Sequence, residues 1–182
     1  MTTKPYRVLC LDGGGIRGLY TATVLQQMAV RVARMNGKNH EGRLDLGANF
    51  DLIVGTSTGS ILATALAAGV ALEDVTHLYR GNAISIFQRP MPLQDGCFGT
   101  KLRTLGWIVH NLFTPANVST PLRTALLSVL KEETLEQMYK RRKIAICIPT
   151  IDAASQKAWV FKTPHGARLT RDNNYKLIDV CM

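Results

Sequence analysis

Two glycine-rich turns near the start of the chain constrain its fold and chemistry more than any other feature of the sequence. The first is Asp12–Gly18, which reads Asp-Gly-Gly-Gly-Ile-Arg-Gly, and the second is Gly55–Gly59, which reads Gly-Thr-Ser-Thr-Gly. Each turn follows a short apolar run and precedes a helical pattern. The sequence therefore predicts two strand–turn–helix units, in which glycine allows a sharp bend and a close approach of the backbone.

The second turn has the G-x-S-x-G spacing of a nucleophile elbow, where a sharp strand-to-helix bend exposes a serine hydroxyl. Residues 51–54 form an apolar strand-like run before it, and Ile61 opens a helical pattern after it. This context predicts Ser57 as a nucleophile. The alternative is an ordinary tight turn in which Ser57 caps the following helix.

The first turn offers a row of backbone N–H groups at a helix start, which can hold an anion. It also matches the dinucleotide pattern G-x-G-x-x-G, but that site needs an acidic residue at the end of the second strand, which here ends in Gly55. Arg17 stands where a cation would support an oxyanion or a lipid phosphate, or would pair with Asp12. A nucleophile and an anion cradle together indicate acyl transfer.

A serine nucleophile needs a base, and none of the four histidines adjoins either turn. One arrangement with the hydrolase order Ser…Asp…His is Ser57, Asp152 and His165. Asp152, however, lies in a short turn between two predicted strands. The triad therefore stays an alternative.

Strands alternate with helices along the chain, which predicts an α/β fold with a largely parallel sheet. The length of 182 residues suits a single domain, 1–182. Apolar patterns and turn residues predict strands over 7–11, 50–54, 144–151 and 158–161, and helices over 19–35, 60–68, 72–86, 120–130, 134–139 and from about 175.

Composition excludes several classes of protein. No apolar run is long enough for a transmembrane helix, and the N-terminus lacks the apolar core of a secretory signal. The four cysteines show no C-x-x-C pair, so we expect no metal site. All four cysteines (Cys10, Cys97, Cys147 and Cys181) are expected to be buried, reduced thiols of a cytoplasmic protein. Cys10 and Cys147 lie in apolar strand-like runs.

The net charge of +9 is compatible with nucleic acid, an anionic membrane surface or simple solubility. Its densest cluster, Lys140–Lys143, follows a helical pattern, where cations favour the helix dipole. This cluster is either a solvent-exposed helix end or a basic surface that faces a membrane. It has no interleaved aromatic residues, so we expect no nucleic-acid partner.

Prolines and glycines predict a long loop over Gln88–Thr100, and long loops in compact domains are often functional. A wider segment, Gln88–Thr114, is considered for that role. It and the residue before it contain Phe87, Phe98, Trp107 and Phe113. The segment is interpreted either as a lid or interfacial contact, or as an ordinary loop that covers the core.

The two glycine-rich blocks, in this order and about forty residues apart, resemble those of the patatin-like phospholipases. Residues 144–163 are also similar to a hairpin region of that family. The resemblance implies a three-layer α/β/α fold and a serine lipid acyl hydrolase without cofactor or metal. By the same resemblance Ser57 is the nucleophile, Gly13, Gly14 and Gly15 supply the oxyanion hole, and Arg17 supports their loop.

The chain departs from the family pattern in one respect. The family's base is an aspartate in a D-G-G or D-G-A motif, and neither motif follows Ser57. The only Asp-Gly after Ser57 is Asp95-Gly96. We therefore expect a chain truncated at its C-terminus that lacks the aspartate, has little or no activity and exposes an apolar sheet edge. The alternatives are an inactive family member and Asp95 as a relocated base.

The resemblance also implies partners. The substrate would be a membrane glycerolipid ester, met by a cytoplasmic protein that is peripheral to the membrane when it acts. Bacterial relatives of this type include effectors of antiviral defence activated by cyclic nucleotides, so a cyclic nucleotide is an expected activating molecule. A second hypothesis is an inactive α/β module that binds a nucleotide or a lipid.

Overall fold

The structure is a computed structural model that describes residues 4–15, 17–37, 44–86, 119–152 and 154–182. The strands are β1 (Val8–Leu11), β2 (Leu52–Gly55), β3 (Ala145–Asp152) and β4 (Lys157–Lys162). The helices are α1 (Arg17–Met35), η1 (Gly47–Asn49), α2 (Thr58–Ala68), α3 (Leu72–Ile86), α5 (Ser119–Leu130), α6 (Leu135–Arg142) and α7 (Leu177–Val180). All predicted elements are present, with bounds close to those expected.

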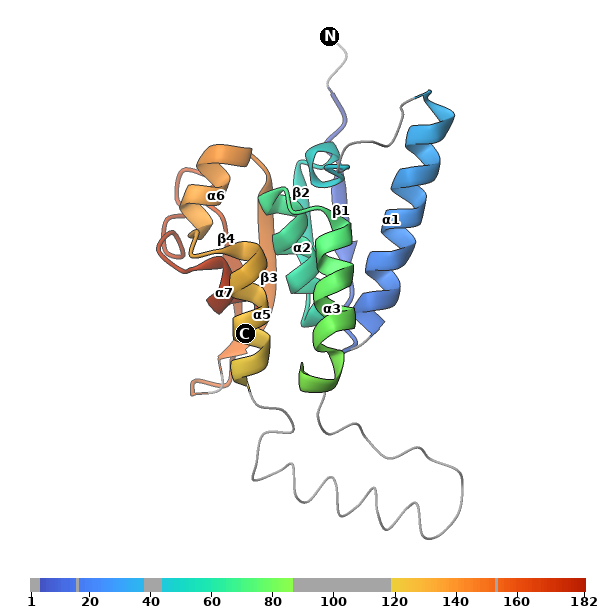
Figure 1. Ribbon diagram of the computed structural model, residues 1–182. Helices are drawn as coiled ribbons and strands as arrows, with labels where there is room; N and C mark the ends of the chain where they lie inside the picture. Colours follow the sequence, from blue (N-terminus) through green and yellow to red (C-terminus); the bar gives the residue numbers. More distant parts are fainter. Residues whose placement is uncertain (1–3, 16, 38–43, 87–118, 153) are drawn as a thin grey trace, which may run out of the picture.

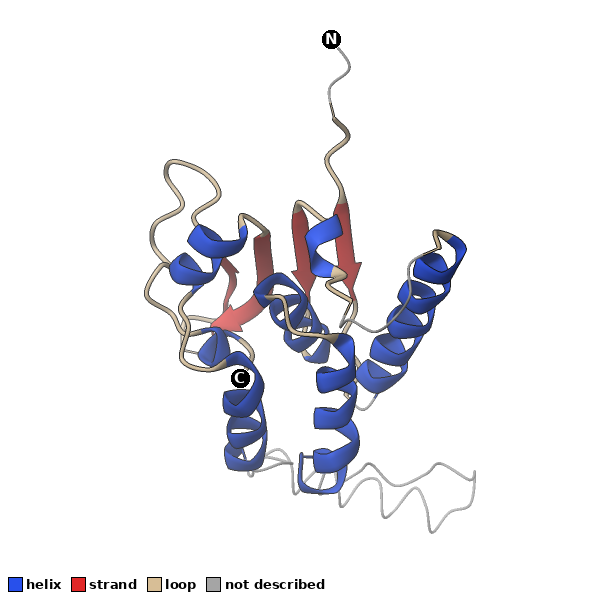
Figure 2. Ribbon diagram, turned by 45° about the horizontal axis from the view of Figure 1, so that its top comes forward, coloured by secondary structure: helices blue, strands red, loops and turns tan. Residues whose placement is uncertain are grey.

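The sheet has the strand order β1-β2-β3-β4, with the first three strands parallel and β4 antiparallel to β3. The connections from β1 to β2 and from β2 to β3 step across the sheet in the same direction. Right-handed crossovers then place the connecting helices on one face, as Figures 1 and 2 show. The architecture confirms the expected α/β class with a largely parallel sheet. It is consistent with a three-layer α/β/α fold, of which the described residues supply the sheet and one helical layer.

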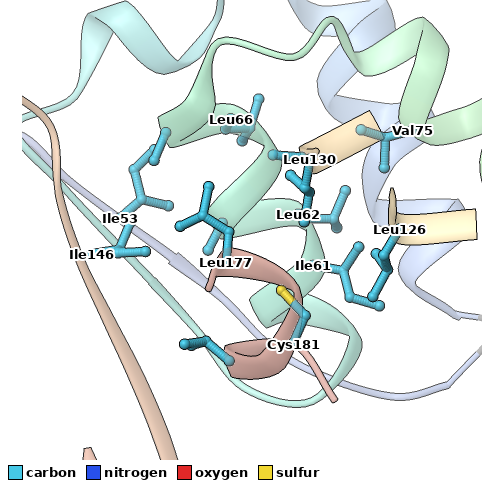
Figure 3. Close-up of a cluster of buried hydrophobic side chains, with 14 of the residues drawn as sticks. Ile53, Ile61, Leu62, Leu66, Val75, Leu126, Leu130, Ile146, Leu177 and Cys181 are labelled. Carbon is cyan, nitrogen blue, oxygen red and sulfur yellow. The ribbon is translucent and has the colours of Figure 1, made fainter. Parts of the chain in front are cut away.

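Helix α2 is the centre of the fold. Every residue from Gly59 to Ala67 is buried, and its alanines allow close packing on β2. Around it lies a cluster of aliphatic side chains from the sheet, α5 and α7 (Figure 3). The elbow at the start of α2 is therefore carried by the most enclosed helix of the described chain.

The expectation that Cys10 is buried is wrong. Leu11 points to the side of α2 and is buried, so Cys10, one residue earlier, points to the opposite face of the edge strand and is exposed. On the same face Cys147 is half-buried, and burial raises its pKa. The apolar strand β1 is therefore covered on one face only by the described residues.

Helix α1 also differs from a simple core helix. Its buried residues are the small ones, Gly18, Ala22 and Ala33. Several larger apolar residues, such as Met28 and Val32, face solvent, whereas Leu19 and Leu25 pack partly against the core. No helix in the described ranges is long and apolar enough to cross a bilayer.

Candidate active site

Ser57 lies at the sharp bend between β2 and α2. Its backbone has φ 50° and ψ −127°, a conformation that non-glycine residues rarely adopt. The residue is exposed, and its hydroxyl makes no capping hydrogen bond to α2. The alternative in which Ser57 is only a helix cap is therefore wrong, and the strained bend presents the hydroxyl outward.

Steric contacts require glycine at positions 55 and 59, on either side of Ser57. A Cβ on Gly55 would collide with the Gly59 carbonyl, and a Cβ on Gly59 would collide with the Leu11 carbonyl. The bend therefore closes on itself and on the end of β1. This is the physical reason for glycine at both outer positions of the G-x-S-x-G spacing.

The structure brings the two glycine-rich turns together. A Cβ on Gly13 would lie 2.6 Å from Ser57 Cβ, which leaves room for glycine alone. The Gly13 N–H donates to Thr56 Oγ1 at 3.1 Å, and the Thr56 N–H donates to the Leu11 carbonyl at 3.2 Å. Residues 43 positions apart in sequence thus form one continuous loop surface beside the serine.

The amides of the first turn differ in their bonding. The Gly13 N–H is engaged by Thr56, whereas those of Gly14 and Gly15 have no hydrogen-bond partner among the described residues. Arg17 donates from Nε to the Gly14 carbonyl at 3.3 Å. Within the described chain Arg17 makes no ion pair with Asp12, so its observed role is to hold the loop.

Tyr79 of α3 contacts the elbow from inside the core. Its side chain is fully buried and its hydroxyl donates to the Thr58 carbonyl at 3.2 Å. A Cβ on Gly18 would lie 3.0 Å from the same hydroxyl, so the first turn of α1 also rests on it. Burial raises the pKa of Tyr79, which keeps the phenol neutral and able to donate.

The basic cluster Lys140–Lys143 closes the far end of α2. Arg142 Nε donates to the Ala67 carbonyl at 3.1 Å, and Arg141 Nη2 donates to the Ala68 carbonyl at 3.2 Å. Cations here complement the helix dipole, whose positive end lies at Ser57.

The same cations are paired with carboxylates. Arg142 pairs with Asp45, Arg141 with Glu133, and Lys140 with Glu136, as salt bridges of 2.7, 2.6 and 3.1 Å. The cluster is therefore largely neutralised and structural. The interpretation as a basic surface free to face a membrane is wrong for these three residues.

The structure does not assemble the triad of Ser57, Asp152 and His165. His165 Nδ1 lies 2.9 Å from Thr163 Oγ1, which binds the Ile146 amide near the start of β3, whereas Asp152 ends that strand. Six residues of strand separate the two ends by about 20 Å. Asp152 instead accepts bonds from Ala154 and Ser155, so this alternative is wrong.

No carboxylate of the described residues is hydrogen-bonded to Ser57. Asp95 and the segment Gln88–Thr114, including its aromatic residues, lie outside the described residues, as does Phe87. The described residues also contain no group of three or more His, Cys, Asp or Glu that could hold a metal ion.

Two contributors to the site were missed by sequence reasoning. Thr56 lies inside the G-x-S-x-G block, where the pattern leaves its position free, and a hydroxyl beside a glycine turn is a weak signal at best. Tyr79 lies 22 residues after Ser57 and looks like one more core residue of α3. Its partner is a backbone carbonyl, so no residue pattern identifies it.

The fold and the site together define an α/β protein with a nucleophile elbow beside a glycine-rich amide loop. Residues 9–182 match the family described as patatin-like phospholipase. The chain belongs to the patatin-like phospholipase family.

Relatives and a solved structure agree with this assignment. The chain is 34% identical over 176 residues to a cGAMP-activated phospholipase of Escherichia coli, covering 97% of this chain and 44% of the relative. It is 32% identical to a cGAMP-activated phospholipase of Vibrio cholerae, covering 97% and 46%. The chain thus spans less than half the length of these relatives.

The crystal structure of VipD from Legionella pneumophila has a similar fold, with a TM-score of 0.50 and 14% identity. The similarity covers 98% of this chain and 42% of VipD. At this identity the likeness supports the fold alone.

Proposed function

We propose that this chain carries the nucleophile of a serine lipid acyl hydrolase that cleaves esters of membrane glycerolipids. The observation that carries the proposal is the strained, exposed Ser57 with Gly13 against its Cβ. Family membership and the names of the relatives support a phospholipase.

In the proposed reaction, Ser57 Oγ attacks the ester carbonyl carbon and its proton passes to a carboxylate base. The free N–H groups of Gly14 and Gly15, with Gly13 shaping the loop, would bind the oxyanion, and Arg17 would keep the loop in place. The positive end of the α2 dipole adds to this stabilisation. The alcohol leaves with the proton, and water then hydrolyses the acyl-enzyme.

The base is proposed to be an aspartate, as in the family resemblance. Asp95 is one candidate, and an aspartate supplied by a longer form of the protein is the other. If neither acts, the chain is an inactive module that binds a nucleotide or lipid, a reading supported by the lack of a described carboxylate at Ser57.

Regulation and location are also proposed from the relatives. Both relatives are named for activation by cGAMP, so we infer that a cyclic nucleotide activates the protein that contains this chain. We further infer that it works in the cytoplasm and at the surface of a membrane.

The test measures fatty-acid release from mixed phospholipid vesicles by the wild-type chain and its Ser57→Ala and Asp95→Asn variants. Release that Ser57→Ala abolishes supports the hydrolase, and parallel loss in Asp95→Asn identifies the base. Release that persists in Ser57→Ala contradicts the proposed nucleophile. No release from a folded wild type supports the inactive module or a base outside the chain, which the longer protein with and without Ser57→Ala distinguishes.

A further inference from the structure

Helix α1 presents a continuous apolar stripe to solvent that the site described above does not use. The stripe, called here the α1 stripe, consists of Tyr20, Val24, Met28, Val32 and Met35. The exposed fractions of Tyr20, Met28 and Met35 are 74%, 58% and 79%. Steps of four and three residues keep these side chains on one side of the helix over about 22 Å.

The stripe is not explained by packing. Helix α1 contacts α3 and α2 through its opposite side, where Ala22 and Ala33 are buried. The fully buried residues on that side are small, Leu19 and Leu25 pack partly against the core, and the stripe residues face outward. Figures 1 and 2 show α1 at the outer edge of the helix layer. A contiguous exposed apolar surface of this kind marks an interaction site.

The charges of α1 indicate what the stripe meets. Arg17, Arg31 and Arg34 are exposed, and the helix carries no Asp or Glu between Arg17 and Met35. Neither the Arg31 nor the Arg34 side chain has an ion-pair or hydrogen-bond partner among the described residues. An apolar stripe flanked only by cations is the composition of a helix that lies in the interface of an anionic bilayer.

The position of α1 connects this surface to the elbow. The helix begins directly after the glycine-rich turn, and a Cβ on Gly18 would lie 3.2 Å from Thr58 Cβ. Tyr20, the first residue of the stripe, follows Gly18 by two residues, so the stripe starts at the end of α1 that packs against the elbow. The stripe itself faces away from α2, so a bilayer on it would lie on the outer side of α1, next to the end of the helix that adjoins the elbow.

We propose that the α1 stripe docks this chain on an anionic phospholipid surface, with the apolar side chains at the acyl boundary and the arginines on the headgroups. The proposal rests on the proposed function and deepens it, because docking would hold the chain on a surface made of its lipid substrate. A second copy of the chain is a less suitable occupant. A two-fold contact of α1 with α1 would gather the arginines of both copies, with no carboxylate from either helix.

The test is flotation of the 182-residue chain with two kinds of vesicle, phosphatidylglycerol mixed with phosphatidylcholine, and phosphatidylcholine alone. We expect binding to the anionic vesicles. Arg31→Gln with Arg34→Gln should weaken it about thirtyfold, because each cation contributes about 1 kcal/mol at such a surface. Met28→Gln with Val32→Gln should weaken it roughly tenfold or more.

Matched controls use residues far from α1. Ile151→Gln removes an exposed apolar side chain of β3, and Lys157→Gln with Arg168→Gln removes two exposed cations. These variants should bind as the wild type does. Thermal melts of all variants check that the exposed substitutions leave the fold intact.

Three results would overturn the proposal: a wild type that does not bind anionic vesicles, α1 variants that bind as well as the controls, or a wild-type dimer that Met28→Gln with Val32→Gln converts to a monomer without any vesicle binding. The last result would identify a second copy as the occupant.

Hydrolysis of a monomeric ester, p-nitrophenyl butyrate, separates this proposal from the proposed function. If Ser57→Ala abolishes ester hydrolysis and the wild type does not bind vesicles, the hydrolase is supported and the docking surface is contradicted. If the wild type binds vesicles through α1 but shows no Ser57-dependent hydrolysis, the docking surface is supported and this chain by itself is not a hydrolase.

Discussion

The hydroxyl of Tyr79 donates a hydrogen bond of 3.2 Å to the carbonyl of Thr58, the residue that follows the nucleophile. The two residues belong to different helices and lie 21 positions apart. Because Gly18 packs against the same hydroxyl, one buried phenol supports the starts of both α1 and α2.

Replacing Tyr79 by Phe should lower the free energy of unfolding by about 1 kcal/mol, because it removes this hydrogen bond and keeps the ring. Urea denaturation measures the change. Tyr20→Phe is the matched control, since the Tyr20 side chain is exposed, and it should leave the midpoint unchanged. Equal midpoints for Tyr79→Phe and wild type would contradict the supporting role.

The backbone of Ser57 should store strain that glycine releases. Ser57→Gly is expected to raise the free energy of unfolding by about 1 kcal/mol, since relief of an unfavourable φ exceeds the entropic cost of glycine. Ser57→Ala keeps a Cβ and should change it by less than about 0.5 kcal/mol. If the two variants have the same unfolding midpoint, the bend is not strained.

The α6 arginines should stabilise α2 more than their surface location suggests. Arg142→Gln is expected to cost about 2 kcal/mol, because it removes two charge-assisted hydrogen bonds, to the Ala67 carbonyl and to Asp45. Lys140→Gln removes an exposed pair with Glu136 and should cost about 0.5 kcal/mol or less. Thermal or urea unfolding measures the loss of stability in both variants. Similar losses for Arg142→Gln and Lys140→Gln would refute the capping role.

Stability should fall at alkaline pH. Burial raises the pKa of Cys181 from 9.0 to about 11, so folding favours the neutral thiol. This contribution, on the order of 2 to 3 kcal/mol, is fully present below pH 9 and is lost as the pH rises to 11. Burial raises the pKa of Tyr79 also, which adds a fall that begins above pH 10.

Urea midpoints across this pH range, for wild type and Cys181→Ala, isolate the contribution of Cys181. The variant should lose the part of the fall near pH 9 that comes from Cys181 and keep the parts that come from Cys147 and Tyr79. A wild-type midpoint that stays constant from pH 9 to 11 would show that Cys181 is not buried as described.

The cysteines should react with a thiol reagent in the order of their exposure. In a Cys97→Ser background, which removes the cysteine outside the described residues, we expect Cys10 to react fastest, Cys147 more slowly and Cys181 only on unfolding. Timed labelling with mass spectrometry measures the order. Slow labelling of Cys10 would mean that this face of β1 is covered.

Much of the fold was predictable from residue patterns. Apolar runs predicted all four strands, because a buried strand needs consecutive apolar residues. Glycine-rich turns follow the first two strands, and a polar turn joins the last two. The apolar repeat of α1 predicted a helix correctly. It did not predict which side is buried, because close packing on α3 selects the small residues Ala22 and Ala33.

The sequence by itself determined the elbow, since Gly55 and Gly59 are required where carbonyls approach and Ser57 must be exposed at the bend. Only the tertiary structure decided that Gly13 lies against Ser57 and that Tyr79 holds Thr58. It also decided that Arg142 caps α2. Local patterns record the conformation each segment requires, whereas contacts between distant segments depend on how the helices pack on the sheet, and backbone partners leave no mark on residue type.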